Sequence, residues 1–379
     1  MPYEWQEEQY NMKSVLFLSV MNGSAWGGSE ELWFRLALYS AANNNITAVV
    51  CFEWPEKKSR LQQLRDAGCI VYTLNSKRSF ISNFQNIRTL KQIPFEQYDV
   101  QVINQGGWKD VVHTPFAKLY KRLSNYVLLY HNYDKGSVLS KRKTALLRNW
   151  AEKAKCNAAA SSKIFSTIAD DLQLTVPRAE VWINPITFLP DAQPETYFNN
   201  SNISIWLMLA ALDVQRKAQD VLITALASAK WKQRNWQLHL YGSGKDKEYL
   251  ETLIQQLQLN DKVFLKGHTH NVKEVLKQSN WLFQCTNKDA MPISVMEAMA
   301  LGLPCLVSAT GDMPKWIADG VSGYVCTAVT ATAIDEKLEI IWQNKQQWKQ
   351  MGKEAFASFM YKYPQPYEME MFKKIVNDL

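Results

Sequence analysis

The sequence is organised around one stretch, Trp281-Leu-Phe-Gln-Cys-Thr-Asn-Lys-Asp-Ala-Met-Pro-Ile-Ser-Val-Met-Glu297. Its apolar run 281–285 has the length of a buried strand, and the polar residues that follow predict a loop at the carboxyl end of that strand. Pro292 favours the first turn of a helix, where its missing N–H costs nothing, and Gly302 ends the helical pattern. A second apolar run at 305–308 completes a strand–loop–helix–strand unit.

Two carboxylates belong to this unit, Asp289 in the loop and Glu297 inside the helix. The free N–H groups of a helix start form an anion site near Asp289. A carboxylate two turns into the helix suits the paired hydroxyls of a ribose. The alternative interpretation makes Asp289 a helix-start acid and Glu297 a solvated helix residue. The stretch alone leaves both interpretations open.

The composition is that of an ordinary globular protein, with 47% hydrophobic and 21% charged residues among 379. No apolar run approaches the roughly 20 residues that span a bilayer, and the acidic start is unlike a secretory signal. The net charge of +7 fits an anionic ligand or membrane surface, whereas the lack of a long Lys/Arg tract argues against nucleic acid. Six scattered cysteines without a CxxC pair favour a cytoplasmic protein with reduced thiols. Peripheral contact with the inner face of the membrane stays open.

Short apolar runs alternate with helical patterns along the chain, which predicts open, mostly parallel sheets. The expected strands are 14–20, 47–52, 69–73, 100–104, 126–130, 156–160, 203–209, 237–241, 263–267, 281–285, 305–308 and 323–326. Further helices are expected, among them 111–123 and 217–229. The predicted fold is α/β, with two Rossmann-like domains whose parallel sheets face a central cleft. The expected bounds are 1–190 for the first domain, 191–202 for a linker and 203–363 for the second domain, with the helix at 364–379 rejoining the first.

Ligands of such sheets bind outside the carboxyl ends of the strands. The first strand leads into Trp26-Gly-Gly-Ser-Glu30, where a glycine turn lets backbone approach a ligand. His131 directly follows another strand, although a lone histidine is more often structural. Gly242 and Gly244 follow a strand of the second domain.

Together these residues resemble a known family, the retaining glycosyltransferases of family 4, which have the GT-B fold. The segment Asp289 to Glu297 is similar to the family's E-x7-E segment. Supporting motifs occur in the family's order at 26–30, 184–185, 212–220, 241–244, 266–268 and 319–323.

The resemblance implies a nucleotide diphosphate sugar as donor, held mainly by the second domain, with no other cofactor. By the family pattern Glu297 would bind the ribose hydroxyls, Lys217 would pair with the diphosphate, and Asp289 would contact the donor sugar. His131 would lie beside that sugar from the first domain. The candidate catalytic residues are thus His131, Asp289 and Lys217. The candidate donor-binding residues are Gly27, Gly28, Arg216, Lys217, Gly242, Gly244, His268, Asp289, Ala290, Met291, Pro292, Ile293 and Glu297.

Three positions depart from the family pattern. Asp289 stands where the family usually has Glu, Ala211 where it has a basic Arg, and Lys315 where it has Glu. Losing the Arg removes a bidentate phosphate clamp that a lysine cannot reproduce, although Arg216 offers a substitute. These departures motivate the alternative of a nucleotide-sugar-binding protein with impaired catalysis on the same fold.

The expected activity is transfer of a sugar with retention of configuration, to a saccharide or lipid-linked acceptor in polysaccharide or glycoconjugate synthesis. A UDP-sugar is the first expectation for the donor, with glucose as the sugar. The protein would position the substrates and stabilise charge on the departing diphosphate. No metal is expected, because no Asp-x-Asp site occurs and His268 with His270 lacks a third ligand. An epimerase or phosphorylase of the same fold is a further alternative, although no pyridoxal lysine is recognisable.

The acceptor side is less well marked. Trp26, Trp108 and Tyr133 offer aromatic faces suited to stacking on an acceptor sugar, whereas packing is the more frequent role of such residues. The basic residues within 118–122 and 141–143 could contact anionic lipid, or could form a face that is merely solvated.

Overall fold

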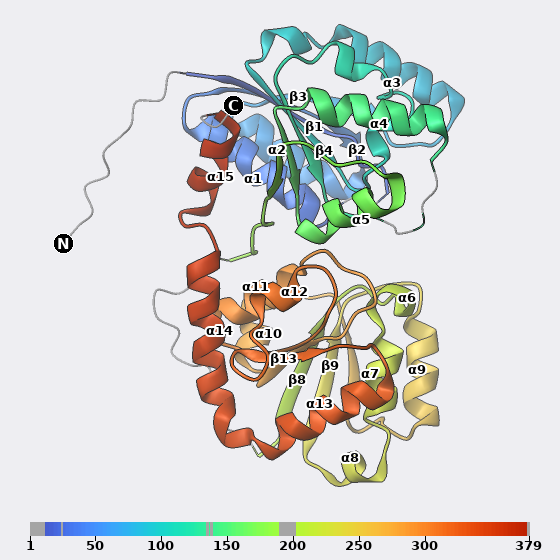
Figure 1. The fold of residues 1–379 in the computed structure, drawn as a ribbon, viewed down its shortest axis with the longest axis vertical. Helices are drawn as coiled ribbons and strands as arrows, with labels where there is room; N and C mark the ends of the chain where they lie inside the picture. Colours follow the sequence, from blue (N-terminus) through green and yellow to red (C-terminus); the bar gives the residue numbers. More distant parts are fainter. Residues whose placement is uncertain (1–11, 24–25, 134–135, 137–138, 189–201, 377–379) are drawn as a thin grey trace, which may run out of the picture. The chain divides into compact units, whose positions relative to one another are not determined.

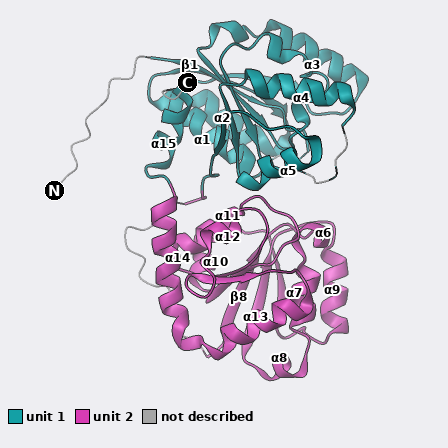
Figure 2. Ribbon diagram, in the orientation of Figure 1, with its two compact units in different colours: residues 1–185, 364–379 teal, residues 186–363 magenta. Residues whose placement is uncertain are grey.

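The computed structural model describes residues 12–23, 26–133, 136, 139–188 and 202–376. The chain forms two compact units (Figure 2). Unit 1 comprises 1–185 and 364–379, and unit 2 comprises 186–363. The predicted linker 191–202 lies outside the described residues except for Asn202.

Unit 1 is built on a seven-stranded parallel sheet with the order β3-β2-β1-β4-β5-β6-β7 (Figure 1). Its strands are β1 Ser14–Ser19, β2 Ile46–Glu53, β3 Ile70–Asn75, β4 Val100–Gln105, β5 Tyr126–Tyr130, β6 Cys156–Ala159 and β7 Ala179–Val181. Its α-helices are α1 Gly28–Ala42, α2 Lys58–Asp66, α3 Phe80–Gln92, α4 Lys141–Lys153, α5 Ser162–Leu172 and α15 Tyr367–Val376. Strands β1, β2 and β5 are nearly continuous apolar runs, as expected of a parallel sheet that is covered on both faces. The central strand β4 also buries the polar residues Gln101, Asn104 and Gln105.

The C-terminal helix α15 packs against α1 of unit 1, although the two lie at opposite ends of the chain. The rings of Tyr39 and Phe372 lie 5.5 Å apart, and Arg35 Nε donates to Glu368 Oε1 at 2.6 Å. The hydroxyl of Tyr367 donates to the carbonyl of Ile183 at 2.6 Å. These contacts hold the last helix on the first unit.

Unit 2 contains a six-stranded parallel sheet with the order β10-β9-β8-β11-β12-β13. Its strands are β8 Ser204–Leu209, β9 Trp236–Tyr241, β10 Val263–Gly267, β11 Trp281–Gln284, β12 Cys305–Ser308 and β13 Gly323–Cys326. Its α-helices are α6 Val214–Lys217, α7 Gln219–Ala225, α8 Ala229–Gln233, α9 Lys247–Gln256, α10 Val272–Lys277, α11 Ile293–Ala300, α12 Met313–Trp316, α13 Ala331–Gln343 and α14 Trp348–Lys362. Its core combines aliphatic side chains with buried tryptophans, of which Trp206 and Trp236 stack with ring centres 5.2 Å apart.

The two parallel sheets confirm the predicted α/β fold class, and the predicted strands lie within two residues of the observed ones. The helix predicted at 111–123 is wrong, because the structure has only the short 3-10 turns Asp110–Val112 and Leu119–Lys121 there. Pro115 lies between them, has no N–H to donate and disfavours helical backbone at the residue before it. The helix predicted at 217–229 is divided, because Ala218 adopts a left-handed conformation with φ 51° and ψ 36°.

Each sheet reverses its chain order once, between β1 and β4 in unit 1 and between β8 and β11 in unit 2. At such a switch point the loops at the carboxyl ends of the two strands separate and leave room for a ligand. The loops after these four strands are therefore where a site is expected. None of the described helices combines the length and apolarity needed to cross a membrane.

Candidate active site

An ion pair between Lys217 and Asp289 joins the loops after β8 and β11 at the switch point of unit 2. The two side chains are 14% and 15% exposed, so their attraction is screened less than that of a surface pair. Asp289 lies just before α11, whose first N–H groups have no intrahelical partner. A cation and free helix N–H groups near one another suit the oxygens of a diphosphate.

Hydrogen bonds around the buried Thr286 hold these two loops together. Thr286 Oγ1 donates to the carbonyl of Arg216 at 2.5 Å, and the N–H of Lys288 donates to the same carbonyl at 3.1 Å. On the other side Ser308 Oγ donates to the carbonyl of Thr286 at 2.7 Å. The backbone of Arg216 is thus fixed beside Lys217, while its side chain is exposed.

Two glycines allow neighbouring loops to approach one another closely. Gly242 has φ 146°, and a Cβ there would lie 1.9 Å from the carbonyl oxygen of Ala210. Gly311 has φ 59°, and its Cβ would lie 1.9 Å from the carbonyl oxygen of Ala290, which also accepts the N–H of Asp312 at 2.9 Å. The predicted Gly242 and Gly244 therefore pack against the loop after β8, and sequence reasoning missed Gly311.

A cavity of about 280 Å³ opens at the carboxyl ends of β8 and β9. It is lined by Leu209, Ala210, Ala211, Tyr241, Gly242, Ser243, His268, Thr269 and Val272. The structure thus brings the predicted Gly242 and His268 to one place. Ala211, the position where the family has an arginine, also contributes to this lining, and its short side chain leaves the space open.

Glu297 in α11 is a buried carboxylate, 3% exposed, so the interpretation as a solvated helix residue is wrong. Its Oε1 accepts the N–H of Thr187 at 3.0 Å and the hydroxyl of Thr187 at 2.5 Å. Burial raises the pKa of Glu297, and the two hydrogen bonds from Thr187 oppose that rise. Within the described ranges only Thr187 donates to this carboxylate. Sequence reasoning missed Thr187, although it closely follows the Asn184-Pro185 motif.

The remaining residues of the predicted donor segment occupy the entry to α11. Ala290 faces the loop after β12 through the hydrogen bond from Asp312, and Met291 is buried. Pro292 is the residue before the helix, with φ −63° and ψ 129°, and Ile293 is its first residue. The helix α11 therefore begins four residues after Asp289.

In unit 1, His131 ends a chain of hydrogen bonds that runs from a fully buried ion pair. Lys57 Nζ donates to Glu30 Oε1 at 2.9 Å, and Ser19 Oγ donates to the same oxygen at 3.1 Å. Asn104 Nδ2 donates to Ser19 Oγ at 3.4 Å, and His131 Nε2 lies 2.7 Å from Asn104 Oδ1. Because Asn104 Oδ1 can only accept, Nε2 carries the hydrogen and Nδ1 presents a lone pair.

This arrangement keeps His131 neutral. Burial lowers its pKa to about 3, and Nδ1 is buried with no hydrogen-bond partner among the residues that the structure describes. A neutral ring with a free Nδ1 can accept a hydrogen bond from a hydroxyl, but it does not supply a proton at neutral pH. Sequence reasoning found His131 from its place at a strand end, but not the chain behind it.

The predicted glycine turn of unit 1 lies at the start of α1, where Gly27 precedes the helix and Gly28 is its first residue. Trp26 before it packs on Phe34 with ring centres 5.3 Å apart. The Nε1 of Trp26 also donates to Glu31 at 2.9 Å.

Trp108 and Tyr133 are 1% and 7% exposed, and their ring centres lie 4.8 Å apart. Neither ring offers a free face, so the structure favours the packing interpretation for both.

The described part of the chain holds no group of three His, Cys, Asp or Glu side chains placed to bind a metal ion. The rings of His268 and His270 lie 4.7 Å apart.

Solved structures place this fold in a known class. The chain resembles a glycosyltransferase from Rickettsia africae with a TM-score of 0.76 at 14% identity, over 98% of this chain and 100% of that one. It resembles Anabaena Alr3699/HepE in complex with UDP-glucose with a TM-score of 0.75 at 16% identity, over 97% and 100%. A further match is WaaG, a glycosyltransferase involved in lipopolysaccharide biosynthesis, with a TM-score of 0.70 at 17% identity, over 96% and 100%. The chain has the GT-B fold.

A family model and curated relatives match parts of the chain. Residues 191–358 match the model of the family described as "Glycosyl transferases group 1". N-acetyl-alpha-D-glucosaminyl L-malate synthase of Bacillus anthracis is 28% identical over 140 residues, 37% of this chain and 35% of that protein. Poly(glycerol-phosphate) alpha-glucosyltransferase of Bacillus subtilis is 24% identical over 165 residues, 43% and 23%. The matched stretch thus spans less than half the length of these relatives. The solved structures show the GT-B fold, and the family model matches residues 191–358, less than half of the chain.

Proposed function

We propose that this protein is a glycosyltransferase that takes a nucleotide diphosphate sugar as its donor. The observation that carries the proposal is the partly buried pair of Lys217 and Asp289 at the switch point of unit 2. Two further observations support it. The family match lies in this unit, and the Anabaena neighbour was solved with UDP-glucose bound.

The site offers a separate surface for each part of such a donor. The cavity beside Tyr241 and Ala211 takes the nucleobase, and the buried carboxylate of Glu297 accepts hydrogen bonds from the ribose hydroxyls. Lys217 and the start of α11 face the diphosphate, and Asp289 contacts the sugar while it orients Lys217. UDP-glucose is the donor we propose first.

The proposed reaction retains the configuration of the sugar. The bond between the anomeric carbon and the diphosphate oxygen breaks, and a bond to the acceptor oxygen forms on the same face. The acceptor proton passes to an oxygen of the departing diphosphate. Lys217 and the helix N–H groups stabilise the charge that develops on this leaving group, so the proposed mechanism uses no metal ion. In unit 1, His131 is held neutral, and its Nδ1 can accept a hydrogen bond from a substrate hydroxyl.

The acceptor we propose is a saccharide or a lipid-linked saccharide, and we place the reaction in the cytoplasm. The names of the relatives support a glycoconjugate product without choosing one. They include a synthase of a glucosaminyl L-malate, a poly(glycerol-phosphate) glucosyltransferase and a lipopolysaccharide galactosyltransferase.

The experiment is a donor screen on the full-length protein. Calorimetry with UDP, GDP and ADP sugars should identify a bound donor, and a labelled sugar should be transferred to an acceptor or slowly to water. Lys217→Ala should slow the transfer by about 10²–10³. If no nucleotide sugar binds, the proposal fails.

The second candidate is a nucleotide-sugar-binding protein with impaired catalysis. Ala211 favours it, because the cavity contains no arginine in the place where the resemblance implies one. It predicts a bound donor without turnover, even when a broad set of acceptors is supplied. Turnover restored by Ala211→Arg would identify the missing side chain as the cause.

A further inference from the structure

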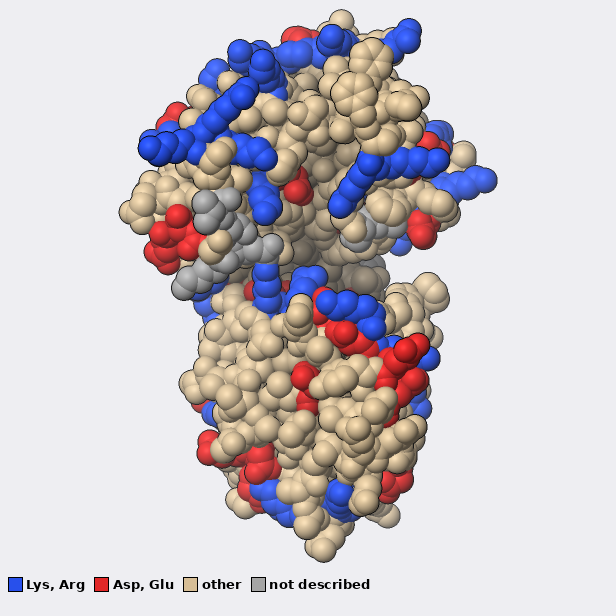
Figure 3. Space-filling view, turned by 90° about the vertical axis from the view of Figure 1, so that its right-hand side faces the viewer, with Lys and Arg blue, Asp and Glu red and all other residues tan. Residues whose placement is uncertain are grey.

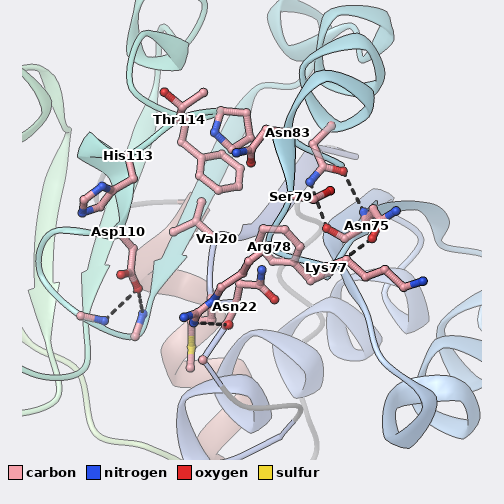
Figure 4. A pocket seen from close by; sticks show the side chains of 18 of the residues that line it. Val20, Asn22, Asn75, Lys77, Arg78, Ser79, Asn83, Asp110, His113 and Thr114 are labelled. Atoms are coloured by element: carbon pink, nitrogen blue, oxygen red, sulfur yellow. Dashed lines mark hydrogen bonds between the residues drawn. The ribbon is translucent and has the colours of Figure 1, made fainter. Parts of the chain in front are cut away.

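A second cavity lies wholly within unit 1, at the switch point of its sheet (Figure 4). Its volume is about 910 Å³. The loops after β1, β3 and β4 form its wall, together with the start of α3. The residues proposed below to hold the ligand, Asn22, Arg78 and Lys109, are among its lining. None of them belongs to the donor site of unit 2. Ligands of open parallel sheets bind at this position. The cavity therefore lies where a binding site is expected.

The cavity wall is cationic. Lys77, Arg78 and Lys109 line it, against a single carboxylate, Asp110. Asp110 Oδ2 accepts the N–H of Gly106 at 3.0 Å and of Gly107 at 2.9 Å. Burial raises the pKa of this carboxyl, and these hydrogen bonds and the charges of Lys109 and Arg78 oppose the rise. Within the described ranges none of the three cations forms an ion pair.

Arg78 is held in place over the cavity. Its Nη2 donates to the carbonyl of Asn22 at 2.9 Å, as the dashed line in Figure 4 shows. A carbonyl neutralises none of the guanidinium charge, so four further N–H groups remain available to an anion. Lys77 points away from Arg78 in the same view. Arg78 and Lys109 are the two cations whose charges act on Asp110.

The electrostatic surroundings are positive. His113 also lines the cavity, with Lys143 Nζ 3.4 Å from its Nδ1. Burial, and then the charges of Lys143 and Lys109, lower the pKa of His113. Figure 3 shows Lys and Arg side chains spread over much of one face of unit 1, with acidic side chains in smaller groups between them. An anion entering here meets a favourable field.

The rest of the wall is amphipathic. Phe52 and Phe116 form a buried pair with ring centres 5.9 Å apart, whereas Asn22 and Asn83 present amides. Asn22 Nδ2 donates to the carbonyl of Ser76 at 2.9 Å, and its Oδ1 is buried without a partner in the described part of the chain. A hydroxyl is the kind of group that would complete the hydrogen bonding of Asn22 Oδ1.

We propose that this cavity binds an acceptor that carries a phosphate group close to its hydroxyl groups, with the phosphate held by Arg78 and Lys109. The assignment as acceptor rests on the proposed function, since the transfer needs a second substrate. Arg is suited to phosphate because its planar N–H groups can bind two oxygens at once.

The phosphate can belong to a soluble sugar phosphate or to a lipid. Phe80, Ile81 and Phe84, in the first two turns of α3, are 86%, 69% and 63% exposed, and Phe80 lines the cavity. Three exposed apolar side chains beside a cationic cavity suit an acyl chain attached to the phosphate.

Calorimetry on the full-length protein tests the proposal with glucose 6-phosphate as probe and glucose as its neutral match. The cavity variant is Arg78→Ala with Lys109→Ala. The matched control is Arg88→Ala with Lys91→Ala, which removes the same charges from exposed positions of α3 that do not line the cavity. Binding should weaken roughly tenfold in the cavity variant and stay unchanged in the control. If the double variant does not fold, Lys109→Ala alone replaces it.

A second arm measures co-sedimentation with vesicles of phosphatidylglycerol and of phosphatidylcholine alone. Binding to the anionic vesicles that falls in the cavity variant and in Phe80→Ser with Phe84→Ser identifies the lipid as the source. Binding of glucose 6-phosphate alone identifies a soluble phosphate. The proposal is overturned if neither probe binds, if glucose binds as tightly as its phosphate, or if the cavity variant binds like the control.

UDP titrated into the same samples separates the two proposals. If Lys217→Ala no longer binds glucose 6-phosphate, the phosphate binds in unit 2 and the inference is overturned. UDP that fails to bind, while the phosphate probe still depends on Arg78 and Lys109, would leave the cavity assigned as a phosphate site and refute the proposed donor.

Discussion

Glu297 and Thr187 form a paired contact in unit 2, in which one carboxylate oxygen accepts both the backbone N–H and the hydroxyl of the threonine. The two residues are 110 positions apart. The contact satisfies one oxygen of a buried carboxylate, while burial still raises the pKa of Glu297. A titratable group with a shifted pKa in such a place is typical of functional sites.

Glu297→Gln should therefore stabilise the protein at neutral pH and weaken donor binding. The folded protein holds the Glu297 proton more tightly than the unfolded chain, so wild-type stability falls as pH rises through the unfolded pKa and levels off above the folded one. Gln has no such dependence. The variant should gain roughly 0.5–2 kcal/mol in the free energy of unfolding at pH 7, and the gain should vanish at about pH 4.

Urea unfolding at both pH values measures the gain, and calorimetry with UDP-glucose measures the loss. Thr187→Val serves as the comparison, because it removes one hydrogen bond and leaves the carboxylate buried. A Gln variant that is less stable at neutral pH, with unchanged donor affinity, would show that Glu297 has a structural role only.

Lys217→Ala should lower turnover more than donor affinity, because the leaving group carries more charge in the transition state than in the bound donor. A loss of about 10²–10³ in kcat is typical of one lost stabilising group. Steady-state kinetics beside calorimetry separate the two effects. Lys217→Arg should restore only part of the rate, since the guanidinium cannot occupy the position of the ammonium against Asp289. An unchanged kcat in the Ala variant would exclude Lys217 from the chemistry.

Ala218→Gly should stabilise the protein. Ala218 is a buried residue with φ 51°, a left-handed conformation that costs an L-residue roughly 1–2 kcal/mol and glycine much less. Glycine loses more conformational entropy on folding than alanine, which offsets part of this effect. The net gain in the free energy of unfolding should be about 0.5–1 kcal/mol. Thermal unfolding gives the shift, with Ala333→Gly as the control inside helix α13. The control variant should lose about 1 kcal/mol in the free energy of unfolding. If both variants are less stable than the wild type, Ala218 is not strained.

His131 should stay neutral over the whole range in which the protein is folded and active. Its folded pKa is about 3 against an ordinary 6.5, so the unfolded chain binds a proton that the folded protein does not. This group therefore takes away stability as pH falls from about 6.5 to about 3. The ring resonances of His131 in NMR spectra should not move between pH 8 and pH 5.

Asn104→Asp provides the contrast for His131. A carboxylate in place of the amide would favour the charged ring and bring its titration into the measured range. A wild-type midpoint near neutrality would refute the neutral assignment and with it the role of His131 as a hydrogen-bond acceptor.

The local patterns of the sequence determined most of the fold. Twelve strands that the structure contains were predicted from apolar runs of strand length, from the helical spacing between them and from Gly or Pro at their ends. These predictions succeed because the pattern of apolar residues within an element decides which of its faces is buried. The edge strand β7 escaped this reasoning, since its residues are exposed and show no apolar pattern. The turn at Ala218 escaped it as well, because Ala gives no sign of a left-handed conformation.

The candidate donor residues also came from the sequence, where Asp289 and Glu297 were marked by their spacing and Lys217 was implied by the family resemblance. Only the tertiary structure decided which groups meet. Lys217 and Asp289 are 72 residues apart, and Ser19 and Asn104 are 85 apart. They become neighbours because the crossover connections set the order of strands in each sheet. No local pattern encodes that order, since it follows from which apolar faces the folded chain buries together.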